Sequence, residues 1–167
     1  MAMALSKGDE VWFYNALSQD SYSPKWLVDY TPVNLRVQPG FLNQSLGLTG
    51  LLYWRVDFWP GPHWDSVDNT GVLGNYNAPG DGMPVYALDE IGIQGVAPSM
   101  RLKWLRDGVQ DYDYVELLKE HGLGDWAMAV VQEAYRGWQE WSEDAPVLLS
   151  IREQLGQRLD QLGSGGN

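Results

Sequence analysis

The sequence contains no cysteine and only two histidines in 167 residues. Without cysteine the chain cannot form a disulfide, use a thiolate nucleophile or hold a cysteine-ligated zinc ion. Basic residues are also scarce, because 11 Lys and Arg stand against 22 Asp and Glu and give a formal net charge of −11. This charge opposes binding to phosphate backbones and to anionic membrane surfaces. We therefore expect neither nucleic acid nor a membrane as a partner.

Long hydrophobic runs are absent as well. No stretch approaches the roughly 18 apolar residues that cross a bilayer, and the segment Met1–Lys7 is too short for a signal peptide. The sequence therefore leaves the cellular compartment open. At 167 residues the chain has the length of one ordinary domain. It is too short for a whole (β/α)8 barrel, which typically takes about 250 residues.

Aromatic residues are plentiful, with nine tryptophans and nine tyrosines. Rings that combine an apolar body with a polar tip gather at binding faces as well as in cores. Carbohydrate is one class of ligand that uses such rings, so the composition is compatible with a sugar site.

The segment 97–118 predicts the longest amphipathic helix of the chain. Ser99 follows a proline and can cap the helix, and apolar residues recur behind it at helical spacing. Gly108 is costly inside a helix, which indicates that another element packs closely there. The charged residues Arg101, Arg106, Asp107 and Asp111 either bind substrate or form a salt-bridged network that fixes the helix.

These residues carry a family resemblance. The string from Ser99 through Arg101, Arg106-Asp107-Gly108 and Asp111-Tyr112 to Tyr114 resembles the S-x-R-x-x-x-L-R-D-G-x-x-D-Y-E-Y signature of the DUF4091 region. That region closes glycoside-hydrolase-like (β/α)8 barrels related to family 123 β-N-acetylgalactosaminidases. Three further pieces are similar and occur in the same order: Glu10–Asn15, Gly50–Trp54 with Asp57 and Trp59, and Gly80–Gly82 with Val85-Tyr86. The resemblance covers most of residues 8–118.

Two strands flank a crossover in the first third of the chain. Residues 9–17 and 51–56 are apolar and rich in residues that favour strands, and residues 26–48 between them are helical in pattern, with a break at Pro39. Since a helix joins them, we expect the strands to be parallel. A third short strand or hairpin arm is predicted at 83–87. Helices are predicted at 125–141 and 146–162, with flexible ends at 1–7 and 163–167.

Candidate site residues follow the strands, because (β/α)8 enzymes build their sites in the loops at the carboxyl ends of strands. Asp57 is the candidate catalytic residue: neighbouring rings could shield its carboxyl group and raise its pKa, or it could simply cap loop amides. His63 with Asp65 is a possible metal pair, but a lone histidine is more often structural, so we expect no metal and no cofactor. The predicted substrate-binding residues are Tyr14, Asn15, Trp54, Trp59, Trp64 and Arg101.

The resemblance implies that the catalytic acidic pair lies on an earlier strand, upstream of these residues. We therefore predict a partial (β/α)8-barrel-like α/β segment over 8–122, with two or three parallel strands, crossover helices and a helical extension over 123–162. Its expected function is one wall of a carbohydrate site, with little turnover alone. One alternative is a glycosidase completed by a homo-oligomer or an upstream barrel segment, and the other is a non-catalytic carbohydrate-binding or interaction module.

Overall fold

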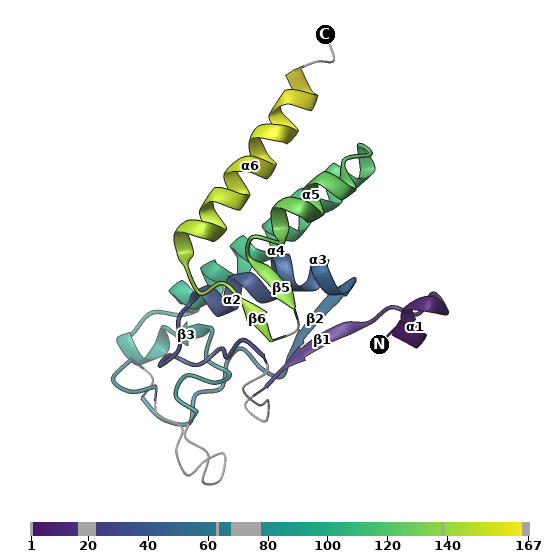
Figure 1. The fold of residues 1–167 in the computed structure, drawn as a ribbon. Helices are drawn as coiled ribbons and strands as arrows, with labels where there is room; N and C mark the ends of the chain where they lie inside the picture. Colours follow the sequence, from purple (N-terminus) through teal and green to yellow (C-terminus); the bar gives the residue numbers. More distant parts are fainter. Residues whose placement is uncertain (1, 17–22, 63, 68–77, 138, 165–167) are drawn as a thin grey trace.

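The first third of the chain forms a parallel pair of short strands (Figure 1). The structure is a computed structural model that describes residues 2–16, 23–62, 64–67, 78–137 and 139–164. Strand β1 (Trp12–Asn15) pairs in parallel with β2 (Gly50–Tyr53), so that Trp12 lies opposite Gly50 and Asn15 opposite Tyr53. This confirms the predicted α/β segment with parallel strands, and the described residues form no closed barrel.

A helical run joins the two strands. It consists of α2 (Val33–Val37), the π-helical turn η1 (Gln38–Leu42) and α3 (Asn43–Leu46). The sequence predicted a break at Pro39, but the chain passes through it as the wide turn η1, which accommodates a residue without an N–H donor. Gly47, with φ +65°, then ends the run in the left-handed conformation that favours glycine.

The long helix α4 (Met100–Glu120) packs across this run. The Ser99 hydroxyl accepts a 3.2 Å hydrogen bond from the Leu102 N–H, which confirms the predicted cap. The close approach predicted at Gly108 is also confirmed, because a Cβ atom there would lie 2.4 Å from the carbonyl oxygen of Arg36 and 2.7 Å from Cγ of Pro39. Glycine therefore sets the distance between α4 and the crossover.

The C-terminal part contains two helices, α5 (Gly124–Val131) and α6 (Ala145–Ser164), which rise together toward one end of the molecule (Figure 1). The predicted helix 125–141 is wrong in its second half, where β5 (Tyr135–Gly137) and β6 (Glu140–Trp141) form a hairpin. Tyr135 is the reason, since its ring packs against Phe13 of β1 and Leu42, and an extended backbone carries it there. Tertiary packing thus overrides the helical spacing that continues through Ala134.

The main core lies between the helices rather than on the sheet. Phe41, Val115, Val131 and Ile151 are among its members and come from η1, α4, α5 and α6. Residues on both sides of the predicted boundary after residue 122 therefore share one core. A smaller cluster around Phe13 covers the helix side of the strands.

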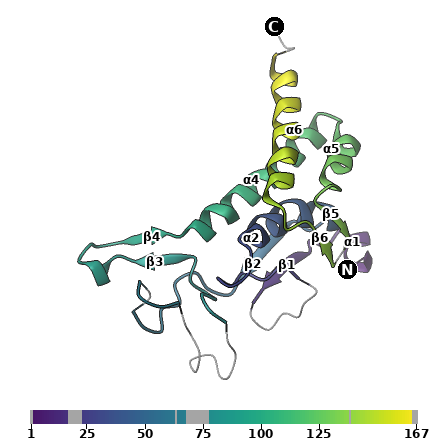
Figure 2. The same ribbon diagram turned by 60° about the vertical axis from the view of Figure 1, so that its left-hand side comes forward.

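A hairpin reaches away from the rest of the chain (Figure 2). Its arms are β3 (Val85–Ala87) and β4 (Val96–Pro98), paired antiparallel with the 3₁₀ turn η2 (Asp89–Ile91) between them. The predicted strand at 83–87 thus exists as a hairpin arm. The remaining element is the short helix α1 (Ala2–Ser6) at the start. Among the described helices, none has the length and apolar character needed to cross a membrane.

Candidate functional site

The carboxyl end of β2 meets a buried aspartate. The hydroxyl of Tyr53, the last residue of β2, donates a 2.8 Å hydrogen bond to Oδ1 of Asp81 and accepts a 2.7 Å bond from the N–H of Gly82. Nε1 of Trp54 donates to Oδ2 of the same carboxylate over 3.0 Å. The side chain of Asp81 therefore fixes two aromatic residues at the point where the strand ends.

Burial dominates the electrostatics of this cluster. Asp81 is 1% exposed, and desolvation raises the pKa of its carboxyl group, although the hydrogen bonds from Tyr53 and Trp54 oppose the shift. Burial and the nearby carboxylate also raise the pKa of the Tyr53 hydroxyl. The tyrosine therefore remains a proton donor to Asp81 throughout the physiological range.

Two glycines shape the loop around Asp81. Gly80 has φ +75° and Gly82 φ +71°, values that side chains rarely adopt. A Cβ atom on Gly80 would lie 2.5 Å from Cγ1 of Val28, and one on Gly82 would lie 2.7 Å from Cζ2 of Trp54. The loop Gly80–Gly82 therefore faces Val28 on one side and Trp54 on the other.

Arg101, in the first turn of α4, holds this loop in place. Its Nη1 donates a 2.6 Å hydrogen bond to the carbonyl oxygen of Gly80, and its Nη2 donates to that of Met83. The guanidinium is buried against these carbonyl groups. Arg101 thus acts on the geometry of the Asp81 loop, and both terminal nitrogens already have main-chain partners.

A cleft of about 390 Å³ lies on the Arg101 side of the loop. Its walls come from the segment after β1, from β3 and from the start of α4, so it opens between the connections that follow the two parallel strands. Such crevices are the usual ligand sites of parallel α/β folds. The cleft is lined by Leu27, Val28, Tyr30, Pro32, Leu35, Tyr86, Ser99, Met100 and Arg101.

The sequence matches the family described as Glycoside hydrolase 123, catalytic domain, over residues 1–118. The chain belongs to this glycoside hydrolase 123 family. A search of curated proteins finds no match to the chain. The parallel pair, the crossover and most of α4 lie within the matched residues, whereas α5, the hairpin β5–β6 and α6 lie beyond them.

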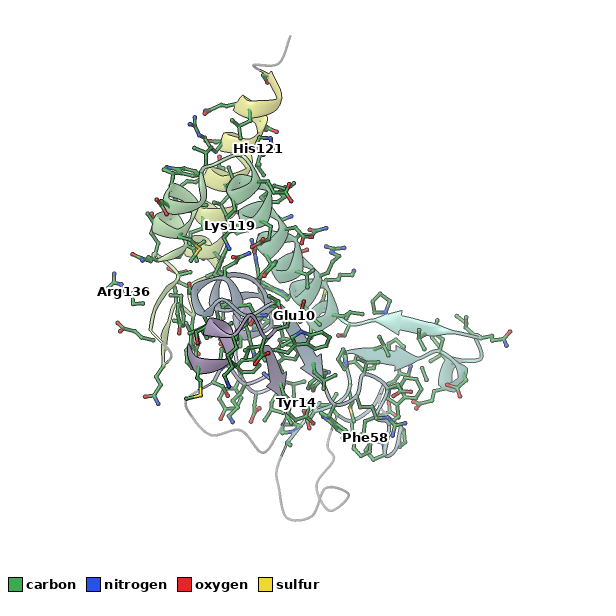
Figure 3. All side chains as sticks on the ribbon, turned by 90° about the vertical axis from the view of Figure 1, so that its right-hand side faces the viewer. Glu10, Tyr14, Phe58, Lys119, His121 and Arg136 are labelled. Carbon is green, nitrogen blue, oxygen red and sulfur yellow. The ribbon has the colours of Figure 1, made fainter. Side chains whose placement is uncertain are left out.

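In this glycoside hydrolase 123 chain, the residues predicted at the end of β1 differ in exposure. The Asn15 side chain is buried, and its Nδ2 donates to the Pro24 carbonyl over 3.0 Å and to Gln38 Oε1 over 2.6 Å. Tyr14 is half-exposed and points to the opposite face of the sheet. Figure 3 shows Tyr14 and Phe58 toward the end of the molecule opposite His121. The Tyr14 side chain is thus partly accessible, whereas Asn15 orders the segment that leads to the cleft.

The predicted loop tryptophans pin the long loop to the hairpin. Nε1 of Trp59 donates a 3.0 Å hydrogen bond to the carbonyl oxygen of Val85, and Nε1 of Trp64 donates a 2.6 Å bond to that of Ala87. The Trp64 ring also lies 5.1 Å, centroid to centroid, from that of Tyr86 in the cleft wall. Trp64 remains partly exposed, so a ring face is accessible there.

Of the two environments considered for Asp57, the one in which rings shield its carboxyl group and raise its pKa is wrong. Its side chain is 51% exposed, and Oδ1 lies 2.7 Å from Nε of Arg55. The hydrogen bond from Arg55 lowers the pKa of Asp57. Asp57 is therefore a carboxylate at neutral pH and has no proton to donate there.

The other charged residues of the signature helix divide into two groups. Asp111 is buried with Arg36, at 2.6 Å, and also contacts Arg152 at 2.9 Å, which supports the predicted salt-bridged network. Arg106 and Asp107 pair on the surface at 2.7 Å. The network joins the crossover, α4 and α6 away from the Asp81 loop, so its role is structural.

Sequence reasoning missed the centre of the site. Gly80-Asp81-Gly82 was used only as a piece of the family resemblance, with no role for the Asp81 side chain, and Tyr30 was not considered. An aspartate between two glycines, downstream of a strand that ends in Tyr-Trp, was the available signal. His63 lies outside the described residues, among which no group of three His, Asp or Glu could hold a metal ion.

Proposed function

We propose that this chain forms one wall of a carbohydrate site of the glycoside hydrolase type, with an N-acetylhexosaminide as the candidate substrate. The observation that carries the proposal is the buried Asp81 that fixes Tyr53 and Trp54 at the end of a parallel strand, in a chain matched by the glycoside hydrolase 123 catalytic domain. Tyr14, Trp54, Trp59 and Trp64 offer the rings, and Arg101 and Asn15 hold the backbone around them.

Glycoside hydrolysis requires catalytic groups that the residues of this proposed site do not all provide. Glycoside hydrolysis needs an acid at the leaving oxygen and a second group at the anomeric carbon. Asp81 and Asp111 are the buried acids among the described residues, and Asp111 lies in the helical network. Asp81 already accepts two hydrogen bonds from aromatic side chains, so we assign it a positioning role.

Asp57 remains our candidate for a catalytic carboxylate. It follows β2, it is exposed to an incoming ligand, and its lowered pKa favours the charged form. A charged carboxylate can orient an acetamido group or stabilise a developing positive charge, but it cannot serve as the general acid. We infer that residues 8–122 correspond to the DUF4091 region and that the general acid comes from another barrel strand. Turnover by this chain alone should therefore be slight.

The direct test is hydrolysis of a panel of aryl β-glycosides, including the N-acetylgalactosaminide, by the wild-type chain and by Asp57→Asn. We expect folded wild-type protein to give little or no hydrolysis while it binds the sugar in saturation-transfer NMR. Turnover that disappears in Asp57→Asn would mean that the chain holds a complete site. Absence of both binding and turnover would contradict the proposal.

Among the described residues no strand pairs with the outer edge of β2, which favours completion of the site by a further strand. The Thr49 N–H donates to the Val11 carbonyl, so the peptide groups of Gly50 and Leu52 face away from β1. On this edge the Gly50 carbonyl accepts only a long bond, 3.4 Å, from Nδ2 of Asn43 among the described hydrogen bonds. A groove of about 340 Å³, lined by Leu105, Val109 and Tyr112 among others, runs along this edge. Oδ1 of Asn43 in the same groove is buried and has no hydrogen-bond partner in the described part of the chain.

These features suit an added strand from a second copy or from an upstream barrel segment. Sedimentation over a wide concentration range distinguishes the two. Association that rises with concentration and is weakened by Leu52→Pro, which removes an outward N–H, would indicate a second copy. A monomer at all concentrations would leave the upstream segment as the source.

The other candidate function is a non-catalytic carbohydrate-binding module. Within the part of the chain that the structure describes, Asp81 is the one buried carboxylate at the strand ends. This favours a binding module, which needs rings and a fixed loop but no acid pair. In that case the sugar binds normally to Asp57→Asn, and binding depends on the loop tryptophans.

A further inference from the structure

The residues that line the cleft beside Arg101 indicate the chemical class of a ligand that would bind there. Seven of its nine lining residues are apolar or aromatic, including Leu27, Val28, Leu35 and Met100. Its volume, about 390 Å³, falls in the range of small-molecule sites. The position of the cleft between the connections that follow β1 and β2 places it next to the proposed sugar wall.

Ser99 and Arg101, the two lining residues that are neither apolar nor aromatic, determine which ligand charge fits. Arg101 directs its terminal nitrogens to the carbonyl oxygens of Gly80 and Met83, and Oγ of Ser99 accepts the Leu102 N–H as the helix cap. The guanidinium of Arg101 is also close enough to the Asp81 carboxylate for the two opposite charges to interact, and an anionic ligand would have to leave water for a mostly apolar surface. The cleft is therefore built for a neutral group.

The rim of the cleft determines the shape of that group. The rings of Tyr30, which is 47% exposed, and Tyr86 both line the cleft, and Met100, 65% exposed, lies at the start of α4. Aromatic faces and a flexible thioether are the partners that a flat ring prefers. A flat apolar group would thus find aromatic and thioether partners here.

The cleft is also continuous with the Asp81 loop. Gly80 packs against Val28 and Arg101 of the cleft, while Gly82, two residues later, packs against Trp54 and Phe58. One short loop therefore separates the cleft from the rings of the proposed sugar wall. A ligand with a sugar at one end and an apolar ring at the other could contact both sides.

We propose that the Arg101 cleft is an aglycone site that binds the neutral aromatic or similarly flat apolar group of a β-glycoside. This inference rests on the proposed function, which supplies the sugar half of the ligand. It makes the apolar aglycone a determinant of specificity, so that glycosides carrying one bind more tightly than the free sugar or its methyl glycoside.

The test compares three probes by calorimetry and saturation-transfer NMR: methyl β-N-acetylgalactosaminide, its benzyl counterpart, and benzyl alcohol alone. All three are neutral, so charge does not differ between them. We expect the benzyl glycoside to bind about tenfold more tightly than the methyl glycoside, because its ring leaves water for the cleft. The NMR contacts should show the phenyl protons to be the most strongly saturated.

Two variants test whether the aglycone binds in the Arg101 cleft. Tyr30→Ala and Met100→Glu alter exposed side chains, and an acidic residue is compatible with the first turn of a helix, so both should fold. Each should bring the affinity for the benzyl glycoside down to that for the methyl glycoside, without changing the latter. Ile93→Ser, which alters an exposed apolar residue in the turn of the β3–β4 hairpin, is the matched control and should change neither affinity.

The outcomes separate this inference from the proposed function. Equal affinities for the benzyl and methyl glycosides would overturn the aglycone site and leave the sugar wall intact. Binding of benzyl alcohol that depends on Tyr30, without binding of the methyl glycoside, would support the cleft as an aromatic site and overturn the proposed function. An advantage of the benzyl group that survives in both variants would place the aglycone elsewhere and overturn the inference.

Discussion

Nε of Arg36 lies 2.6 Å from Oδ2 of Asp111, and this ion pair joins the crossover between the strands to the signature helix α4. Both side chains are almost fully buried, with Arg36 2% exposed. Burial raises the pKa of Asp111, while its bonds to Arg36 and Arg152 oppose the shift. Asp111 is thus held between Arg36 and Arg152, and the buried charge of Arg36 depends on Asp111 for compensation.

We predict that Asp111→Ala lowers the free energy of unfolding by about 3–5 kcal/mol, because it leaves the Arg36 guanidinium buried without its counter-ion. Urea melts followed by circular dichroism measure the change. The double variant Arg36→Met, Asp111→Leu should recover most of the loss, since it removes both charges. Asp107→Ala, which breaks the exposed pair with Arg106, is the control and should cost less than about 1 kcal/mol. A loss in Asp111→Ala as small as in this control would contradict the prediction.

Gly108 gives a second prediction about the same helix crossing. In Gly108→Ala the new methyl group would lie 2.4 Å from a backbone carbonyl oxygen, so the helices must separate. We expect a loss of about 1–3 kcal/mol in unfolding free energy, despite the better helix propensity of alanine. Gly156→Ala in α6 is the matched control: its Cβ would meet only Cε2 of Tyr114 at 3.4 Å. That variant should gain about 0.5–1 kcal/mol, and a similar gain in Gly108→Ala would show that the crossing can relax.

Features that depend on residues close together in the sequence could be predicted. The cap at Ser99, the close packing at Gly108 and the parallel pair β1–β2 follow from local spacing and turn chemistry. The Tyr53–Asp81 bond was not predictable in this way, because the two residues are 28 positions apart. The glycines on either side of Asp81 marked a special loop but did not indicate which side chain it meets. The hairpin β5–β6 was missed for the same reason, since Tyr135 packs against Phe13 from the other end of the chain. The environment of Asp57 depended on the rotamer of Arg55, which no pattern specifies.

The raised pKa of Asp81 predicts a pH dependence of stability. The folded state binds the Asp81 proton more strongly than the unfolded chain, whose pKa is about the ordinary 3.8. Folding therefore gains from Asp81 as pH falls into the range just above 3.8, and this contribution is lost as pH rises through the folded pKa. The difference in Tm between wild type and Asp81→Asn, measured from pH 7 to pH 4, should shift in favour of wild type on acidification.

Asp57→Asn is the control, because its effect on Tm should change with pH in the opposite direction. The pKa of Asp57 is lowered by Arg55, so any contribution to stability is present at neutral pH and lost as pH falls through the folded pKa. The Tm difference for this pair should therefore shift against wild type on acidification, and only slightly, because the group is exposed. If the Tm differences for Asp81→Asn and Asp57→Asn change in the same direction on acidification, Asp81 does not titrate as a buried group with a raised pKa.

The loop tryptophans allow their structural role to be separated from ligand contact. Phenylalanine at position 64 keeps an aromatic face but removes the Nε1 donor to the carbonyl oxygen of Ala87, whereas alanine removes both. We expect Trp64→Phe to lower stability by about 1 kcal/mol and to keep sugar binding, and Trp64→Ala to lose binding as well. Trp59→Phe and Trp59→Ala should behave in the same way through Val85. Thermal melts and saturation-transfer NMR with methyl β-N-acetylgalactosaminide report the two effects independently. If both alanine variants bind the sugar as wild type does, the tryptophans only pin the loop to the β3–β4 hairpin, and the ligand contacts other rings of the site.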